Sequence, residues 1–165
     1  MRKLVALGAA GLLALAIAAP ASARSQGQSI VDTAIAVNAS TGEFDHLIEA
    51  VVRADLVATL DGNRQFTVFA PTDAAFEVLF DTLGVSGVND IPVGTLRAVL
   101  LYHVAPGERF AEDVVSSSRI RTVSKGFLWP SVNGGVYIND AQVIAADIDV
   151  SNGVIHVIDR VLLPG

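Results

Sequence analysis

The chain has 165 residues, of which 52% are hydrophobic, and it contains no cysteine. Its 11 basic and 17 acidic residues give a net charge of −6, which argues against binding nucleic acid or an anionic membrane through general electrostatics. The absence of thiols excludes disulfide bonds, thiolate metal sites and a cysteine nucleophile.

The N-terminus has the pattern of a secretory signal peptide over residues 1–23. Arg2 and Lys3 precede an apolar run from Leu4 to Ala19, and Ala21-Ser22-Ala23 is typical of a signal peptidase site. An uncleaved membrane anchor is the alternative, but the run is short for a bilayer span. We expect cleavage before Arg24 and export to the periplasm or the extracellular space, by a route that the lack of disulfides makes more typical of bacteria.

The mature chain is expected to form one domain. Residues 24–28 are polar and are interpreted as a flexible start, and the sequence of residues 29–165 shows neither a linker nor an internal repeat. That length is enough for a single domain with a substantial core. Loss of the signal leaves nine basic residues against 17 acidic residues, so the mature net charge is −8.

The stretch around Phe66 predicts a hydrophobic strand that leads directly into a helix. Side chains alternate from Phe66 to Ala70 at strand period, and Pro71 then removes a backbone donor that a longer ladder would need. Thr72 is placed to cap the helix, and the charge of Asp73 suits the first helical turn. The apolar face of this helix is formed by Phe76, Leu79, Phe80 and Leu83, and Gly84 follows as a C-cap.

Helical spacing recurs in the first two thirds of the chain, whereas the last third is rich in short β segments. The other predicted helices cover Ile30 to Val37 with a capping box from Ser29 to Asp32, the region around Phe44 to Val51, Leu56 to Leu60, Leu96 to His103, and Phe110 to Val115. We expect Pro106-Gly107 to stop the fourth of these helices. The predicted strands cover Arg119 to Val123, Phe127 to Val132, Val136 to Asn139, Gln142 to Ala146 and Val154 to Ile158. This order predicts an α+β fold.

Three stretches resemble, in the right order, the sequence pattern of the fasciclin domain, a module of extracellular adhesion proteins. Thr67 to Phe76 is similar to the first motif, Tyr102-His103 to a second, and Gly153 to Leu162 to the last. The resemblance covers about Gln28 to Pro164. It implies a β-wedge or sandwich flanked by a small group of helices, in which the Phe66 to Ala70 strand joins the C-terminal strands and its helix packs across their apolar face.

The resemblance also implies where a partner would bind. In fasciclin domains, a Tyr-His motif and a short Asp-Ile segment before the last motif are implicated in cell adhesion and integrin recognition. Tyr102-His103 matches the first, and Asp147-Ile148 matches the central pair of the second, although the flanking residues differ from the animal pattern. The alternative is a structural role, with Tyr102 and His103 in the core and Ile148 at the end of the sheet.

Trp129 is a further candidate for contact with a partner. It precedes Pro130, and because proline in a sheet is confined to edge strands or bulges, we expect this aromatic side chain at the rim of the sheet. There it either binds a protein or carbohydrate or packs in the ordinary way. The motif residues that we interpret as determinants of the fold are Thr67, Pro71, Thr72, Asp73, Phe76, Gly153 and His156.

The sequence carries no positive pattern for catalysis or metal binding. His46 lies on an amphipathic helix and is expected to face solvent, while His103 and His156 lie in apolar stretches, where a hydrogen-bonded core residue is the usual outcome. No spacing fits a zinc site, and Asp147 with Asp149 falls far short of a calcium ligand shell. We therefore predict no metal, no cofactor and no enzymatic activity.

These features predict an exported, noncatalytic adhesion or matrix-binding module that recognises a cell-surface or matrix protein or polysaccharide. We expect a monomer or weak homo-oligomer that does not insert into a membrane after signal cleavage. Two alternatives are kept. A periplasmic carrier of a small apolar ligand needs a dry, enclosed cavity of at least about 300 Å³ between helices and sheet. A hydrolase needs the ring of His103 or His156 open to solvent and hydrogen-bonded to a nucleophile.

Overall fold

The computed structural model describes residues 28–164, so the expected signal peptide lies outside the described residues. The helices are α3 (Ile30–Thr41), α4 (Asp45–Arg53), α5 (Val57–Leu60), α6 (Asp73–Leu83), the 3-10 helix η2 (Val88–Asp90), α7 (Val93–Tyr102) and α8 (Ala111–Ser116). The strands are β2 (Phe66–Pro71), β3 (Val104–Pro106), β4 (Ile120–Arg121), β5 (Phe127–Leu128), β6 (Pro130–Val132), β7 (Val136–Ile138), β8 (Ala141–Val150) and β9 (Gly153–Ile158). Across residues 28–164, no helix combines the length and apolar character needed to cross a bilayer.

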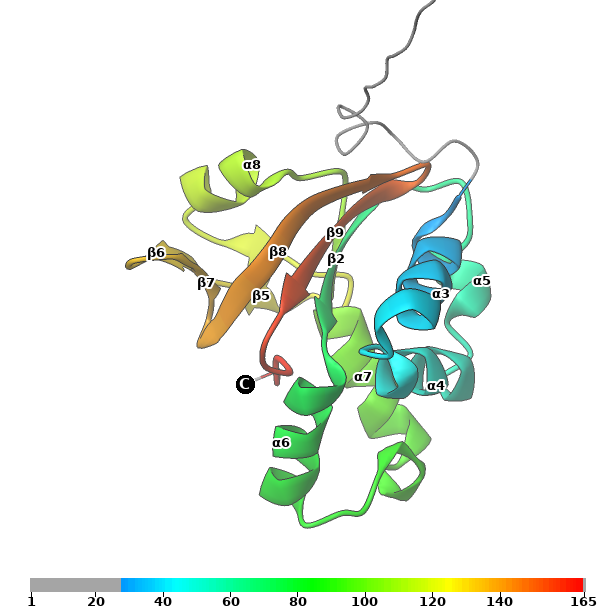
Figure 1. Ribbon diagram of the computed structural model, residues 1–165. Coiled ribbons are helices and arrows are strands. Elements are labelled where there is room, and N and C mark those ends of the chain that lie inside the picture. The colour runs from blue at the N-terminus through cyan, green and yellow to red at the C-terminus, as the bar shows by residue number, and fades with distance from the viewer. Residues whose placement is uncertain (1–27, 165) are drawn as a thin grey trace, which may run out of the picture.

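A mixed six-stranded sheet runs in the order β3-β2-β9-β8-β7-β6 (Figure 1). β2 lies parallel to β9, with Phe66 opposite Gly153 and Pro71 opposite Ile158, and the other neighbouring strands are antiparallel. The predicted union of the Phe66 strand with the C-terminal strands is therefore confirmed. Every residue of β2 and β9 is buried, because both faces of these strands are covered.

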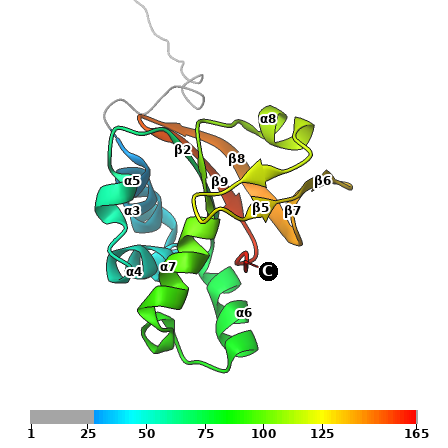
Figure 2. The ribbon, with the colours of Figure 1, turned by 180° about the vertical axis from the view of Figure 1, so that it is seen from behind.

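Helices α3, α4, α5 and α7 cover one face of the sheet, and α8 with a two-stranded ribbon of β4 and β5 covers the other (Figure 2). Val68 and Ala70 belong to an apolar cluster with α3 to α7, whereas Phe69, which lies between them in sequence, belongs to a second cluster with α8 and the ribbon. Alternate side chains of a strand point to opposite faces, so β2 takes part in both cores. The arrangement confirms the predicted α+β fold.

Helix α3 is longer than predicted. It continues to Thr41 because the hydroxyls of Ser40 and Thr41 donate to carbonyls four residues earlier and so fit within the helix. Gly42 ends it in the left-handed conformation, with φ 69°. The predicted capping box is confirmed at the other end, where the side chains of Ser29 and Asp32 each accept the other's backbone N–H.

The chain after α7 differs from the prediction. The helix ends at Tyr102, and Val104–Pro106 pairs antiparallel with β2, so Pro106-Gly107 ends a strand and not a helix. Further on, β8 extends to Val150, well beyond the predicted end at Ala146. Shifts of register along β8 interrupt the alternation by which a strand is identified in sequence, and this explains the short prediction.

The predicted unit of strand, proline and helix is present. Thr72 Oγ1 accepts the N–H of Ala75 at 3.3 Å, and Gly84 ends α6 with φ 69°. Figure 1 shows α6 beyond the end of β2, where it packs on α4, so its expected position across the sheet face is wrong. Leu83, predicted on the buried side of this helix, is exposed for the same reason.

Candidate functional site

Tyr102, the first residue of the Tyr-His motif, is a core residue. The residue is 5% exposed, and its hydroxyl donates to the carbonyl of Phe127 at 2.6 Å and accepts from Asn139 Nδ2 at 3.2 Å. These contacts join the end of α7 to β5 and to the turn after β7. A ring placed this way stabilises the packing of the ribbon, as the structural alternative for Tyr102 expects.

His103 is likewise enclosed, with only 2% of its surface exposed. Its Nδ1 lies 2.7 Å from the carbonyl oxygen of Val99, and its Nε2 accepts the N–H of Leu162 at 2.8 Å. The carbonyl can only accept, so Nδ1 carries the proton and the ring is neutral. Burial lowers the pKa of His103 to about 4, and the hydrogen bond to Val99 opposes that shift.

His156 on β9 is held in the same manner. Its Nε2 lies 2.8 Å from the carbonyl of Arg109, its Nδ1 accepts the N–H of Asp147 at 3.2 Å, and its ring stacks on Phe69. Burial lowers its pKa, against the opposing effects of the Arg109 carbonyl and the Asp147 charge. Neither His103 nor His156 is open to solvent, so the requirement set for a hydrolase is not met.

Asp147 and Ile148 lie at the irregular part of β8. Asp147 has a positive φ of 60°, and its Oδ1 accepts the N–H of Ala111 at the start of α8, at 2.6 Å. Ile148 is half-buried against the larger apolar cluster. Asp147 therefore joins β8 to two neighbours, the start of α8 and the ring of His156, while its own side chain stays at the surface.

Most residues predicted as fold determinants sit at junctions between elements. Thr67 Oγ1 donates to the carbonyl of Gly107 and accepts the N–H of Arg109, both at 2.8 Å. Asp73 Oδ1 accepts the N–H of His46 at 2.9 Å, which joins α6 to α4. Pro71 and Phe76 are both buried.

Gly153 allows the close approach of β9 to β2. Its φ is 153°, and a Cβ at this position would fall inside the carbonyl oxygen of Phe66, its partner in the parallel register. Only glycine fits such an approach.

His46 departs from its expected exposure. Its ring is half-buried, 5.1 Å from the ring of Phe80 and 6.0 Å from that of Phe76. The helix face on which it lies is covered by α6 because α6 packs on α4. Within residues 28–164, no group of three or more histidines and carboxylates is placed to hold a metal ion.

Trp129 lies at the rim of the sheet and is 54% exposed. Pro130, the next residue, begins the edge strand β6, as the constraint on proline predicts. Along the neighbouring ribbon, Ile120 and Leu128 face the core, so the alternating residues Arg119, Arg121, Phe127 and Trp129 lie on the outer face. We define these four residues with Lys125, in the turn of the ribbon, as the aromatic-basic surface.

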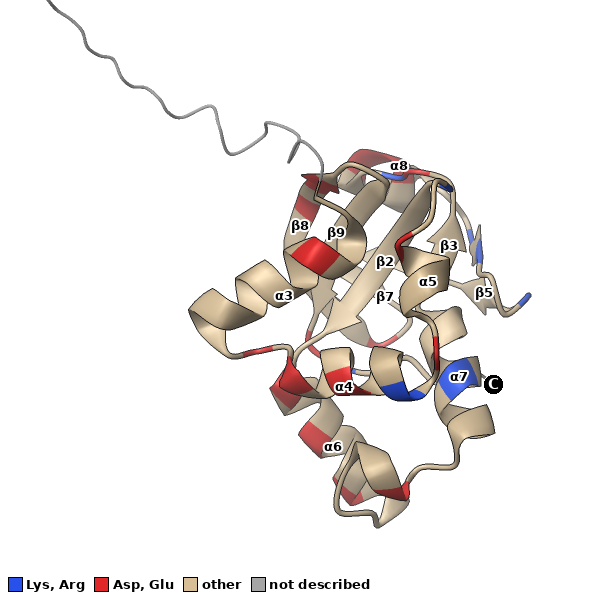
Figure 3. Cartoon of the chain, turned by 90° about the vertical axis from the view of Figure 1, so that its right-hand side faces the viewer, with Lys and Arg blue, Asp and Glu red and all other residues tan. Residues whose placement is uncertain are grey.

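Phe127 contacts two other members of this surface. The guanidinium carbon of Arg119 lies 4.3 Å from the ring centroid of Phe127, and the Phe127 and Trp129 rings are 6.4 Å apart. Figure 3 shows basic residues beside β5, whereas acidic residues are spread over α4, α6 and α8. Sequence reasoning found only Trp129; the alternation of Arg119, Ile120 and Arg121 was the signal for part of the rest.

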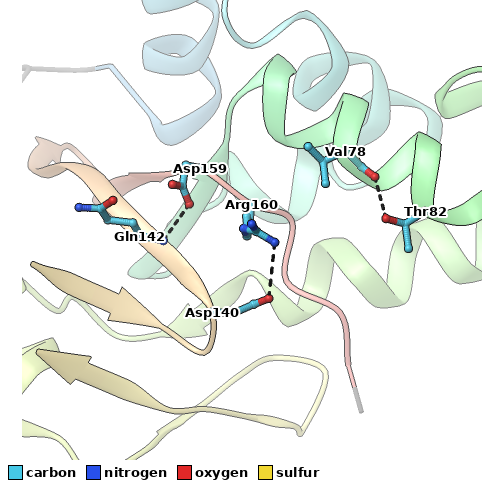
Figure 4. Close-up of polar contacts among 6 residues, drawn as sticks. All are labelled: Val78, Thr82, Asp140, Gln142, Asp159 and Arg160. Carbon is cyan, nitrogen blue, oxygen red and sulfur yellow. Dashed lines mark hydrogen bonds and ion pairs between the residues drawn. The ribbon is translucent and has the colours of Figure 1, made fainter. Parts of the chain in front are cut away.

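Three basic residues outside this surface are engaged with other parts of the chain. Arg53 donates to the carbonyls of Ile91 and Asn89, and Arg97 donates twice to the carbonyl of Ala54. Arg160 Nη1 lies 4.0 Å from Asp140 Oδ2, and Figure 4 shows this ion pair close to the hydrogen bond from the Gln142 N–H to Asp159 Oδ1. The same view shows the Thr82 hydroxyl donating to the Val78 carbonyl within α6. The ribbon thus gathers Arg119, Arg121 and Lys125 in an otherwise acidic chain.

Asn152 is a structural residue that the sequence did not identify. Its Oδ1 accepts the N–H of Ile30 at 2.9 Å, and its Nδ2 donates to the carbonyls of Leu60 at 2.6 Å and Gly62 at 3.2 Å. In the sequence, Ser151-Asn152-Gly153 is indistinguishable from an ordinary hairpin turn.

An apolar cavity of about 180 Å³ lies among α3, α4, α5 and the sheet. It is smaller than the roughly 300 Å³ set for a carrier of a drug-sized ligand. The carrier alternative in that form therefore gains no support.

The described residues form a mixed sheet between a helical layer and a β-ribbon, with a buried Tyr-His pair at the end of one helix. These features define an α+β domain whose three histidines are buried or half-buried. The family model of the Fasciclin domain matches residues 42–164, and the chain belongs to that family.

Three known proteins that contain similar sequences or folds can be compared with this chain. Protein sll1483 of Synechocystis sp. is 39% identical over 144 residues, which cover 80% of this chain and 73% of that protein. Human periostin is 30% identical over 125 residues, which cover 73% of this chain and 15% of periostin. A solved pair of FAS1 domains from the insect cell adhesion molecule fasciclin I matches with a TM-score of 0.67 at 18% identity, covering 83% of this chain. This chain spans about half of that structure, 51%, and the likeness concerns the fold.

Proposed function

We propose that this fasciclin domain is an exported, noncatalytic binding module whose contact with a cell-surface or matrix partner is made by the aromatic-basic surface. The observation that carries the proposal is the exposed ring of Trp129 beside Arg119, Arg121 and Lys125, in a chain whose mature charge is −8. The occurrence of FAS1 domains in a cell adhesion molecule supports the same class of function.

The chemistry of this surface favours an acidic polysaccharide. Guanidinium groups bind carboxylate and sulfate groups through paired hydrogen bonds, and an exposed tryptophan offers a flat apolar area to a sugar ring. The arginine stacked on Phe127 has part of its conformational freedom removed before binding. An acidic protein is the other outcome that the experiment below distinguishes.

Tyr102 and His103 support the surface from beneath instead of meeting the partner. The Tyr102 hydroxyl donates to the backbone carbonyl of Phe127. The residue on whose ring Arg119 stacks is thereby held to the end of α7. In this proposal the Tyr-His motif contributes to adhesion by holding the ribbon in place. The Asp147-Ile148 segment lies on β8 and acts in the same structural sense.

One module presents a small contact area, so we propose a monomer or weak homo-oligomer whose useful adhesion comes from several copies on one surface. Interfaces much below about 1,200 Å² of total buried area are weak, and avidity compensates for this. Export by a signal peptide over residues 1–23, and a single domain over residues 29–165, belong to the same proposal.

The test uses the mature chain, Arg24 to Gly165, with immobilised polygalacturonic acid, neutral dextran, whole cells and matrix extract treated or not with protease. We expect binding to the acidic polymer and to protease-treated extract, weakened when the salt concentration is raised. Trp129→Ala should reduce affinity at least about tenfold, and Arg119→Gln/Arg121→Gln by a similar factor.

Matched controls are Val132→Ala, an exposed apolar residue of β6, and Arg64→Gln, an exposed arginine before β2. Both should bind like the wild type, and circular dichroism should show every variant folded. Binding by folded Trp129→Ala that equals the wild type overturns the assigned surface. Binding lost only after protease treatment of the extract replaces the polysaccharide with a protein partner.

A further inference from the structure

The cavity among α3, α4, α5 and the sheet has an apolar lining, and its volume fits a ligand smaller than the one that the carrier hypothesis requires. Its volume is about 180 Å³, and no charged residue lines it. Its walls include Val31 of α3, Val51 of α4, Val68 of β2 and Ile155 of β9. A cavity of about 150 Å³ with walls of this kind, engineered in another protein, stays dry and takes up benzene.

The space exists because α3 is fixed at both ends and has small side chains in between. At its start, Asn152 Oδ1 accepts the N–H of Ile30. At its end, Asn38 Oδ1 accepts the N–H of Phe44, and Asn38 Nδ2 donates to Asp45 at 2.7 Å. These bonds oppose a collapse of the helix onto the sheet, and Ala34, which lines the cavity, leaves space that a larger side chain would fill.

The surface that the cavity offers to a ligand is wholly apolar. Thr33 lines the cavity, but its hydroxyl is buried and presents no surface to it. A ligand that carries a polar group would therefore lose its hydrogen bonds to water without regaining them in the cavity.

The cavity also reaches the surface. Ile35 and Val52, which both line it, are 49% and 62% exposed. A ligand can therefore enter between α3 and α4 without unfolding of the domain. The lining offers no counter-ion, so a charged ligand would lose its hydration without compensation.

We propose that this cavity is a binding site for a neutral, apolar molecule of about one aromatic ring in size. The inference is independent of the aromatic-basic surface, because the two sites lie on opposite faces of the sheet and share no residue.

The test is a titration of the 15N-labelled mature chain with benzyl alcohol and, separately, with toluene, which has similar size but no hydroxyl. We expect saturable shifts for amides of α3, α4 and β2 and a raised midpoint of thermal unfolding. Toluene should bind more tightly than benzyl alcohol, because the hydroxyl of benzyl alcohol finds no partner in the cavity. Intermolecular nuclear Overhauser contacts from the probe to methyl groups of Val31 and Val68 should place it in the cavity independently of any variant.

A matched pair of substitutions tests the position of the site. Ala34→Leu should fill the cavity and abolish binding of both probes, whereas Ala39→Leu, on the exposed side of the same helix and outside the cavity, should leave both unchanged.

Absence of saturable shifts in the wild type overturns the site, and so does binding that Ala34→Leu leaves intact. Tighter binding of benzyl alcohol than of toluene overturns the wholly apolar character assigned to the cavity. Concentration-dependent dimerisation with shifts confined to Ile35 and Val52, in the absence of probe, would overturn the proposal in favour of a second copy of the chain on this face.

Discussion

The ring of His103 and the backbone of Leu162 are joined by a hydrogen bond of 2.8 Å that spans 59 positions of the chain. Through it, the end of α7 holds the C-terminal segment against the smaller core, to which Leu162 belongs. The bond requires Nε2 as an acceptor, so it exists only while the ring is neutral. Protonation of His103 is thereby coupled to the position of the C-terminal segment around Leu162.

We predict that the free energy of unfolding falls as the pH is lowered from about 6.5 toward 4. The His103 pKa is about 4 in the folded protein against 6.5 ordinarily, so below 6.5 the unfolded chain binds a proton that the folded chain does not. The contribution of neutral His103 to the free energy of unfolding is fully present above about pH 6.5, and about 3 kcal/mol of it is lost by pH 4. His156, whose pKa is also lowered, adds in the same direction.

Urea unfolding at several pH values between 7.5 and 4.5 measures this slope. His103→Gln removes the titration and should flatten the profile, although the variant is less stable at neutral pH. If the wild type and His103→Gln lose stability in parallel over this range, the coupling assigned to His103 is wrong.

Gly153→Ala should prevent folding or lower the free energy of unfolding by more than about 3 kcal/mol, because its Cβ would meet the carbonyl oxygen of Phe66 in the paired strands. Gly134→Ala is the matched control. Gly134 has a φ of 74° but open space around it, so only backbone strain applies, about 1 kcal/mol. Equal losses in the two variants, measured by urea unfolding, would mean that strain and not the close approach explains Gly153.

How far the sequence predicts this fold depends on whether the signal is local. β2, the Thr72 cap and Gly84 were predicted because alternation, capping and a left-handed glycine act within a few residues. β3 was missed because Val104–Pro106 is a strand only through its pairing with Phe66 to Val68, some forty positions earlier. No local pattern marks such a pairing in so short a segment.

The residues of the candidate site show the same difference between local and long-range signals. The exposed position of Trp129 followed from Pro130, a local constraint. For Tyr102, sequence resemblance left both a binding and a core role open, since a motif can be shared because it holds a fold together. Its burial is decided by Phe127 and Asn139, which lie in other elements of the fold.

Asn152→Ala should lower the free energy of unfolding by about 2–4 kcal/mol, because it leaves the N–H of Ile30 and the carbonyl of Leu60 buried without their partner. The loss should appear first at α3, as faster hydrogen exchange of the Ile30 amide. Asn133→Ala, in the exposed turn between β6 and β7, is the control and should be nearly neutral. Unchanged exchange at Ile30 in Asn152→Ala would contradict the anchoring role.

Thr72→Ala should lower the free energy of unfolding by about 1 kcal/mol, the usual contribution of a helix N-cap. Thr72→Ser keeps the oxygen that accepts from Ala75 and should lose much less. Thermal or urea unfolding of the two variants distinguishes the contribution of the capping hydrogen bond from that of the packed methyl group. Equal losses would show that packing of the buried methyl group, and not the hydrogen bond, explains the residue.

Asp147 distinguishes a structural role from a binding role for the Asp-Ile segment. Its positive φ and its hydrogen bond to Ala111 are both retained by asparagine, so Asp147→Asn should leave stability nearly unchanged. Asp147→Ala loses both and should cost about 1–2 kcal/mol by urea unfolding. Because we place the partner on the aromatic-basic surface, both variants should bind polygalacturonic acid and cells like the wild type wherever they are folded. A folded, stable Asp147→Asn that no longer binds would return the contact to this segment, since the substitution removes only the negative charge.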